Sequence, residues 1–385
     1  MASARPGEAV IIDRSGLELL IAALRAQGNR VLGPVARDGA ILHGELAGVD
    51  DLPTGVHDVH APGSYRIEQG EDDACFAWAV GPQSFKPVFF PAAETLWRAG
   101  TADGSRAIER PDRARGPALA LVGVRPCELA ALDVLDQIFS AGAHPDPRYT
   151  ARRAASFVVV AECGRPGETC FCTSMGTGPD ARGEFDLALC ELGTGAEHRF
   201  LVRSGSPAGE ALLARLPTRV AQEADLDARA EVLDGARHAM GRAVETEGIT
   251  ELLEANIDHP RWEEVAERCL SCGNCTMVCP TCFCSGIEDV SDLRGVLERR
   301  RRWASCFELD HSRLHSGPVR ASTASRYRQW ATHKLGTWQE QFGTSGCVGC
   351  GRCITWCPVG IDLTEEVAAI RLSDLRLAAR AGAAR

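Results

Sequence analysis

Two stretches of this sequence carry cysteines at the same spacing. Residues 269–280 read CLSCGNCTMVCP and residues 347–358 read CVGCGRCITWCP, so both follow the pattern C-x2-C-x2-C-x3-C-P. In this pattern three thiolates hold one [4Fe–4S] cluster, and the fourth reaches over to a second cluster. We therefore expect each run to give its first three cysteines to one cluster and its last cysteine to the other. The expected ligand sets are Cys269, Cys272, Cys275 with Cys357, and Cys347, Cys350, Cys353 with Cys279.

This spacing is that of bacterial-type ferredoxins, which carry electrons. Structural zinc is the alternative chemistry for so many thiols, but zinc sites usually use two C-x2-C pairs separated by a longer loop. Here four cysteines fall within eleven residues, and they do so twice. The crowding favours two [4Fe–4S] clusters over zinc.

Two further cysteines follow segments that are expected to be buried strands. Residues 118–124 (ALALVGV) and 156–161 (SFVVVA) are continuous apolar runs, which is typical of strands covered on both faces. A helical pattern over residues 128–139 lies between them, and strand, helix, strand predicts parallel neighbours. Cys127 and Cys163 come shortly after these strands, at the sheet edge where ligands collect. Cys127 also begins a helix, whose dipole is expected to lower the pKa of a thiol.

The loop after the second strand is rich in glycine and proline and holds two more cysteines. Alternate residues of an extended segment share a face, and glycine N–H groups can approach cluster sulfurs closely. A third [4Fe–4S] site is one interpretation of these thiols, and buried or redox-active thiols without a metal are the other. The four members of this third site would be Cys127, Cys163, Cys170 and Cys172.

The Thr-Cys-Phe-Cys sequence of that loop occurs again at residues 281–284, directly after the first cysteine run. Either copy, or both, could serve the third site, and one more cysteine downstream is a further candidate. The candidates without an assignment are Cys282, Cys284 and Cys306. Cys75 and Cys190 lie in apolar segments and are expected in the core.

Composition limits the class of protein. The chain has 385 residues, 45% of them hydrophobic, which suffices for two domains with their own cores. A net charge of -10 and a pI near 5.6 exclude a typical nucleic-acid binder. Seventeen cysteines beside such runs indicate metal ligands in a reducing cytosol rather than disulfides. The sequence shows neither a secretory h-region nor an apolar run near the ~20 residues of a membrane span, so we expect a cytoplasmic protein without direct membrane insertion.

Two domains are expected along the chain. An α/β domain with a parallel-containing sheet should occupy residues 1–250 and carry the additional iron–sulfur site. A mainly helical dicluster ferredoxin domain should follow over residues 255–375. A long insert, residues 285–345, separates its cysteine runs, and the pattern SDLRGVLERRRRW within it favours helix. The arginines at residues 299–302 are expected to be a solvated helix face, a docking patch for an acidic partner, or charge that raises the potential of a nearby cluster.

Several of these motifs together resemble one group of proteins. They are GVRPCELAAL at 123–132, CFCTSMGTGP at 170–179, CPTCFC at 279–284, WASC at 303–306 and the segment 346–362. The chain resembles the iron–sulfur beta subunit of cytoplasmic sulfhydrogenases, which are NADP-linked nickel–iron hydrogenases. It is equally similar to the related A subunit of anaerobic sulfite reductase. The resemblance spans about residues 81–362.

The resemblance implies an electron-transfer subunit that is not catalytic alone. It would relay electrons between a flavin subunit that binds NAD(P)H and a catalytic subunit with nickel–iron or sirohaem, and the eight ferredoxin cysteines would be cluster ligands. The sequence itself has no G-x-G-x-x-G after a strand and no P-loop. An enzyme in its own right is the alternative, in which a CFC loop or Cys127 performs thiol–disulfide chemistry fed by the clusters.

Overall fold

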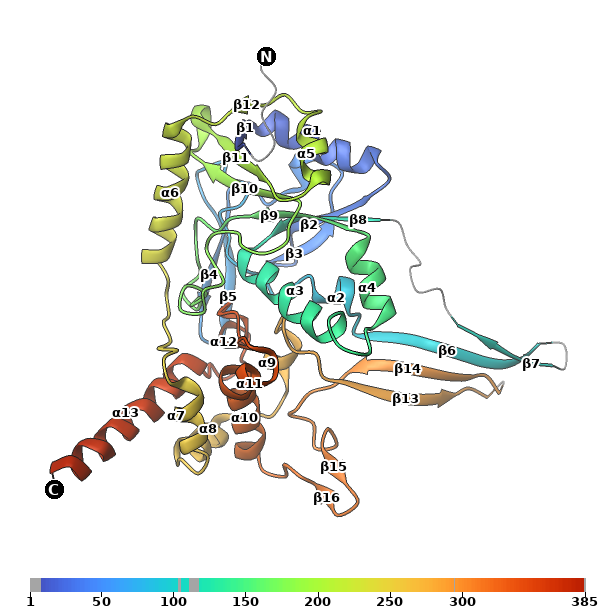
Figure 1. Ribbon diagram of the computed structural model, residues 1–385, viewed down its shortest axis with the longest axis vertical. Coiled ribbons are helices and arrows are strands. Elements are labelled where there is room, and N and C mark those ends of the chain that lie inside the picture. The colour runs from blue at the N-terminus through green and yellow to red at the C-terminus, as the bar shows by residue number, and fades with distance from the viewer. Residues whose placement is uncertain (1–7, 103–104, 111–117, 294, 384–385) are drawn as a thin grey trace.

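The computed structural model describes residues 8–102, 105–110, 118–293 and 295–383 (Figure 1). Within these residues an eight-stranded sheet runs in the order β12-β1-β11-β10-β9-β8-β2-β3. Its strands are β1 (Val10–Ile12), β2 (Arg30–Arg37), β3 (Ala40–Glu45), β8 (Leu119–Val124), β9 (Ser156–Ala161), β10 (Leu187–Leu192), β11 (Arg199–Ser204) and β12 (Arg219–Val220). The four central strands β2, β8, β9 and β10 pair in parallel. The predicted parallel-containing sheet is therefore confirmed.

Both faces of the middle of this sheet are buried. Successive side chains of a strand point to opposite faces, so neighbouring residues of β8 lie in different cores. Leu121 packs in the core that contains α3 (Pro126–Phe139), and Val122 packs in the core beneath α1 (Arg14–Ala26). The unit β8-α3-β9 is the strand, helix, strand arrangement that the apolar runs predict. The other helices of this region are α2 (Lys86–Phe89), α4 (Pro147–Ala154), α5 (Pro207–Leu213) and α6 (Glu223–His238).

The C-terminal region contributes a group of helices, most of them short, near the hairpin of β4 (Val56–Ala61) and β5 (Ser64–Gln69) (Figure 1). These helices are α7 (Ile249–Ala255), α8 (Arg261–Arg268), α9 (Asn274–Met277), α10 (Thr323–Thr332), the π-helix η3 (His333–Thr337), α11 (Trp338–Phe342), α12 (Arg352–Thr355) and α13 (Leu363–Ala383). Trp262, Trp330 and Ile354 lie in their shared core. No helix in the described part of the chain is both long and apolar enough to span a membrane.

A second sheet extends away from both regions as an arm (Figure 1). Its strands lie in the order β13-β14-β6-β7 and are antiparallel. They are β6 (Ala93–Ala102), β7 (Ser105–Glu109), β13 (Ser285–Ser291) and β14 (Leu297–Trp303). Because β14 pairs with β6, the insert and the N-terminal region share this sheet. The domain boundary expected near residues 250–255 stays a prediction.

The prediction of helix in the insert is wrong for its first half. Residues 285–291 form β13 and residues 297–303 form β14, and two short strands follow, β15 (Arg313–Leu314) and β16 (Gly317–Pro318). The charged run is extended because its cross-strand neighbours carry the opposite charge. Arg299 lies opposite Asp289 and forms a 2.6 Å ion pair with it. The mainly helical character expected of the C-terminal domain is not confirmed.

The arginines at residues 299–302 are consequently not a solvated helix face. Each of them forms an ion pair with a nearby carboxylate. The pairs are Arg299 with Asp289, Arg300 with Glu298, Arg301 with Glu94 and Asp146, and Arg302 with Glu288 and Glu308. Carboxylates of the arm and of neighbouring segments balance their charge, so they do not form the free basic docking patch that the sequence suggests.

Candidate iron–sulfur sites

The two cysteine runs share one local backbone geometry. In each run the residue two positions after the first cysteine adopts a left-handed conformation, with φ of 51° at Ser271 and 64° at Gly349. The N–H of Ser271 donates to the sulfur of Cys269, and that of Gly349 donates to Cys347, both over 3.4 Å. Such bonds to cluster sulfurs are among the features that set reduction potentials. The loop is thus shaped to hold a thiolate in a fixed place.

One helical turn carries the third cysteine of each run. Gly273 and Gly351, with φ of 73° and 74°, precede α9 and α12. Glycine adopts this left-handed conformation at no steric cost. Cys275 and Cys353 follow within these turns, so the repeat in sequence is also a repeat in structure.

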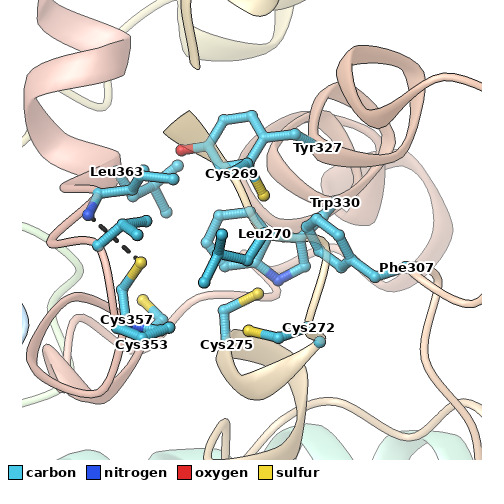
Figure 2. A pocket seen from close by; sticks show the side chains of 14 residues that line it. Cys269, Leu270, Cys272, Cys275, Phe307, Tyr327, Trp330, Cys353, Cys357 and Leu363 are labelled. Carbon is cyan, nitrogen blue, oxygen red and sulfur yellow. Dashed lines mark hydrogen bonds between the residues drawn. The ribbon is translucent and has the colours of Figure 1, made fainter. Parts of the chain in front are cut away.

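The first run opens onto an apolar cleft (Figure 2). The thiols that line it belong to Cys269, Cys272, Cys275, Cys353 and Cys357. Aromatic walls come from Phe307, Tyr327 and Trp330, and the N–H of Ile361 donates to the Cys357 sulfur over 3.3 Å. Cys357 therefore lies beside the first run, as the inferred pairing requires. The ligand assignment itself stays a prediction.

The last cysteine of the first run lies at the start of the second run. The Thr281 hydroxyl is 3.2 Å from the Cys279 sulfur and donates to the carbonyl of Gly346 over 2.6 Å. The Lys334 ammonium donates to that hydroxyl over 2.6 Å and to the Gly346 carbonyl over 3.1 Å. These contacts hold Cys279 close to Cys347.

The thiols of the second set are close enough to repel one another as thiolates. Burial raises the pKa of Cys353 well above its ordinary value, and the thiolates of Cys347, Cys350 and Cys279 raise it further. Metal binding requires deprotonated thiols and supplies the positive charge that stabilises them. Four sulfurs gathered in this way fit an iron–sulfur cluster as ligand donors.

The four cysteines of the predicted third site line one cavity. It lies at the carboxyl ends of β8 and β9, where the sequence places it. Its sulfur-bearing walls are Cys127, Cys163, Cys170 and Cys172, joined by Cys350 of the second run. A Cβ at Gly178 would lie 3.0 Å from the Cys172 sulfur, so this glycine lets the loop close over the thiol. The all-sulfur donor set, among proline and valine side chains, fits an iron–sulfur cluster.

The expectation of a low pKa at Cys127 is wrong. Burial, followed by the thiolates of Cys172 and Cys350, raises the pKa of Cys127 well above its ordinary value. Loss of hydration outweighs the helix dipole because the thiol is shut off from water. A thiol with a raised pKa is a poor nucleophile. This finding weighs against the thiol–disulfide alternative.

The third site and the second run are bound directly to each other. The N–H of Phe171 donates to the Gly349 carbonyl over 2.8 Å, and the Thr177 hydroxyl donates to the Val348 carbonyl over 2.7 Å. A Cβ at Gly349 would lie 2.6 Å from the backbone of Phe171. Only glycine allows this approach, which is how Cys350 reaches the wall of the third cavity.

The remaining candidates form a separate group. Cys282, Cys284 and Cys306 line a cavity of about 230 Å³ together with His311 and His333. The two copies of the Thr-Cys-Phe-Cys sequence therefore serve different cavities. The sequence leaves open which copy belongs to the third site, because the answer depends on contacts between distant segments.

Sequence reasoning missed the buried cations at these sites. Arg352, 1% exposed, donates to Glu128 of α3 over 2.7 Å and to the Gly81 carbonyl over 2.8 Å. In the sequence, only the position of Arg352 inside the second cysteine run indicates that it lies close to a cluster site. Nothing local indicates that Lys334 is buried beside Cys279.

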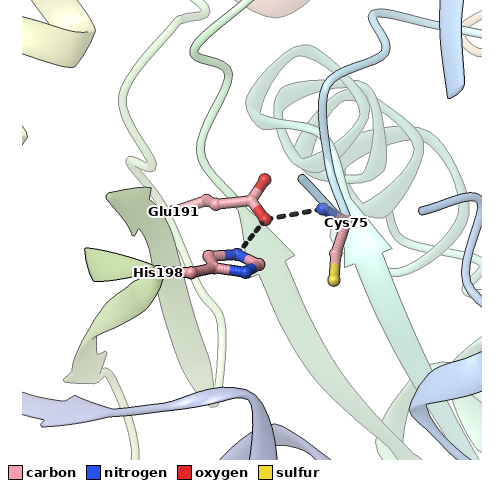
Figure 3. A group of neighbouring side chains, drawn as sticks. All are labelled: Cys75, Glu191 and His198. Atoms are coloured by element: carbon pink, nitrogen blue, oxygen red, sulfur yellow. Dashed lines mark hydrogen bonds and ion pairs between the residues drawn. The ribbon is translucent and has the colours of Figure 1, made fainter. Parts of the chain in front are cut away.

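A group of three different side chains lies away from these cavities (Figure 3). Cys75 is buried, as predicted, beside Glu191 and His198. The Glu191 carboxylate accepts from the N–H of Cys75 over 2.6 Å and from the His198 ring over 2.7 Å. Arg14 donates to the Cys75 sulfur over 3.1 Å. These bonds connect β10, which carries Glu191, to the segment that carries Cys75. Cys190, 1% exposed, is also buried.

Distances between thiols bear on the zinc alternative. Among the described residues, Cys75, Glu191 and His198 form the one group whose donor atoms all lie within 4.8 Å of one another. Thiolates around a single tetrahedral zinc ion are ~3.8 Å apart, given Zn–S bonds of about 2.3 Å. In the described chain, no three thiols of the cysteine runs come that close to one another.

Comparison with known proteins agrees with this geometry. Residues 268–361 match the family described as 4Fe-4S dicluster domain. The chain is also similar to a protein named sulfhydrogenase 2 subunit beta from Pyrococcus furiosus. The two are 33% identical over 255 residues, which cover 65% of this chain and 73% of that protein.

Proposed function

Since the chain belongs to the family of sulfhydrogenase beta subunits, we propose that it relays electrons between a flavin subunit that binds NAD(P)H and a catalytic nickel–iron subunit. The chain is an iron–sulfur electron-transfer subunit of an oxidoreductase, and the identity of both partners is the proposed part. It has no catalytic role alone in this proposal. A cytoplasmic location, expected from the sequence, belongs to the same proposal.

One observation carries the relay. Neighbouring sites share cysteine walls: Cys350 lines the third cavity as well as belonging to the second run, and Cys353 lines the first cleft. Electron transfer between centres falls steeply with distance, so sites in contact form an efficient path. The proposed order is third site, second cluster, first cluster.

Each cluster, when bound, would accept and release one electron at a time. The residues around it set how readily it does so. N–H groups of Ser271, Gly349 and Ile361 donate to ligand sulfurs and thereby stabilise the more negative reduced state. The buried ammonium of Lys334 acts in the same direction at the second cluster.

The two ends of the path differ in exposure. At the first cleft Cys272 is exposed and Leu270 is 64% exposed. At the other end Cys127, Cys170 and Cys172 are buried. We assign electron exchange with one partner to the rim of the first cleft, because a partner can approach closely there.

Iron and acid-labile sulfide in anaerobically purified protein test the proposal. Two clusters require about eight irons per chain, and the third site raises the number to about twelve. A Cys350→Ala variant should lose one cluster, whereas Cys190→Ala, which alters a buried thiol outside these cavities, should lose none. Zinc in place of iron, with no sulfide, would contradict the proposal. Co-purification with a nickel–iron partner and NAD(P)H-linked hydrogen turnover would identify the complex.

A further inference from the structure

The cavity between the arm and the C-terminal helices has no part in the relay described above. Cys282 and Cys284 reach it from the segment after the first cysteine run, and Cys306 reaches it from the segment after β14. The N–H of Ala304 donates to the Cys284 carbonyl over 2.9 Å and holds the two segments together. We propose that these three cysteines bind an additional [4Fe–4S] cluster whose fourth iron is held by a histidine of the cavity wall.

Buried positive charge supports an anionic occupant. Lys86 and Lys334 are 2% and 3% exposed. The Lys86 ammonium donates to the carbonyls of Cys279 and Cys282 over 2.8 and 3.1 Å, and Lys334 lines the cavity. The oxygens that accept from these lysines in the described chain are carbonyls and a hydroxyl. A buried ammonium needs a negative partner. The cysteines that line the cavity can supply this negative charge as thiolates, and a bound metal keeps buried thiols ionised.

The lysines are not accounted for by the second cluster alone. Lys334 bonds to Thr281 and Gly346, so it faces the junction of the two cysteine runs. Lys86 lies over the ring of Trp303, 3.9 Å from its centroid, at the end of β14, and it donates to the carbonyls of both Cys279 and Cys282. The pair therefore spans the second cluster and the new cavity.

The cavity has room for more than a single metal ion. It measures about 230 Å³, whereas one water molecule needs on the order of 10–15 Å³ by the same measure. Cys282, Cys284 and Cys306 are also absent from the groups of described residues whose donor atoms all lie within 4.8 Å. A mononuclear tetrahedral site would need that closeness.

Three thiolates leave one corner of a cubane without a cysteine. His311 and His333 line the same cavity, and imidazole nitrogen is an established ligand of iron–sulfur centres. The His333 ring lies 4.9 Å from the ring of Trp338 and 6.4 Å from that of Phe283, which limits its motion. Either histidine could complete the site, and substitution decides between them.

The cavity adjoins the relay at one wall. Trp330 lines both this cavity and the first cleft. Cys282 also follows Cys279 of the second set by three residues. A cluster here would be a side branch of the path, because its cavity adjoins residues of both ferredoxin sites. The inference does not depend on the identity of the partners.

Iron and sulfide content of the full chain tests the site. The triple variant Cys282→Ala, Cys284→Ala, Cys306→Ala should lose about four irons and four sulfides relative to wild type. The matched control Cys190→Ala should keep the iron and sulfide content of the wild type. Unchanged iron in the triple variant, or loss of zinc instead of iron, would overturn the proposal.

A second measurement covers the case in which the triple variant fails to fold. In the native wild-type holoprotein, all three cysteines should resist alkylation and become reactive once iron is removed. Cys190 serves as the control, since its protection comes from burial alone and should not change under the same mild iron removal. Ready alkylation of the three thiols while iron is bound contradicts the site.

Single variants then identify the fourth ligand. Replacement of the ligating histidine, His311→Ala or His333→Ala, should shift the electron paramagnetic resonance signal of one cluster. The other replacement should leave the spectrum unchanged. If neither variant changes any signal, the histidine ligand is excluded and the proposal in this form fails.

Discussion

The two cysteine runs share spacing and backbone geometry, yet they lie in very different surroundings. The first run is at the surface, with Cys272 exposed and Leu270 at the rim of its cleft. The second is packed against the sheet domain, and Cys350 is 7% exposed. At equivalent positions of the repeat stand Asn274, whose amide donates to a carbonyl, and Arg352, whose guanidinium is buried in an ion pair.

This contrast separates what the motif determines from what its surroundings determine. Spacing and glycine positions give both runs the same loop and the same N–H donation to sulfur. Exposure, buried charge and contact with a third site come from segments far away in sequence. In the proposed relay, the same motif would therefore be the surface exchange site in the first run and an internal connection between sites in the second. Four comparisons between the runs test this account.

The largest difference is expected at the position that follows Gly273 in the first run and Gly351 in the second. Arg352→Ala leaves the Glu128 carboxylate, 2% exposed, without its partner and should destabilise the protein by about 3–5 kcal/mol. Asn274→Ala removes one amide hydrogen bond and should cost about 1 kcal/mol. Denaturant unfolding of the anaerobic holoprotein measures both. Equal losses would contradict the contrast.

A double variant provides the control for this prediction. Arg352→Met combined with Glu128→Leu removes both charges of the buried pair at once. Most of the lost stability should return, because the cost of the single variant is that of an unpaired buried charge. A double variant as unstable as Arg352→Ala would mean that packing, not charge, is responsible.

The next difference concerns the glycines before α9 and α12. Their φ angles are 73° and 74°, so alanine pays the same backbone cost of about 1–2 kcal/mol at each. A Cβ at Gly351 would also lie 2.5 Å from the Thr169 carbonyl, whereas at Gly273 the nearest atom is the Ser305 hydroxyl at 3.0 Å. Gly351→Ala should therefore cost about 3 kcal/mol, clearly more than Gly273→Ala. Thermal unfolding of the two variants side by side checks the order.

Buried charge should distinguish the reduction potentials of the two clusters. The reduced cluster is more negative, so the Lys334 ammonium stabilises it. Lys334→Met should lower the potential of the second cluster by on the order of 100 mV and change that of the first much less. A redox titration followed by electron paramagnetic resonance separates the two signals. Equal shifts at both clusters would refute a local effect of the lysine.

The smallest expected difference is kinetic. Cys272 is open to solvent whereas Cys350 is buried, so a chelator under mildly oxidising conditions should reach the first cluster sooner. Loss of its signal should be on the order of tenfold faster than loss of the second. Simultaneous loss of both signals would indicate that the domain opens as a whole.

The parts of the fold that depend on local pattern could be predicted from sequence. The apolar runs ending at Val124 and Ala161 form parallel strands, because burial on both faces requires such runs. The arm could not be predicted, because the partner of β14 is β6, about 200 residues earlier in the chain. The local pattern around its arginines favours a helix, and the carboxylates that explain the extended conformation lie on neighbouring strands.

The sites divide in the same way. Spacing alone suggests the ligands of the two ferredoxin clusters, and topology brings Cys127 and Cys163 to one sheet edge. Whether Cys170 or Cys282 belongs to that edge depends on tertiary contacts, such as the bond between Phe171 and Gly349. The raised pKa of Cys127 could not be predicted either. Burial of the thiol outweighs the helix dipole, and the degree of burial does not follow from the sequence.

Electron flow through Cys350 tests the central claim most directly. The measurement compares hydrogen turnover of the assembled complex, purified anaerobically, with NAD(P)H and with reduced methyl viologen, which can reduce the catalytic subunit directly. In the Cys350→Ala complex the relay predicts loss of the NAD(P)H-linked turnover while the viologen-linked turnover remains. If NAD(P)H still drives turnover at the wild-type rate, electrons do not pass through this chain as proposed.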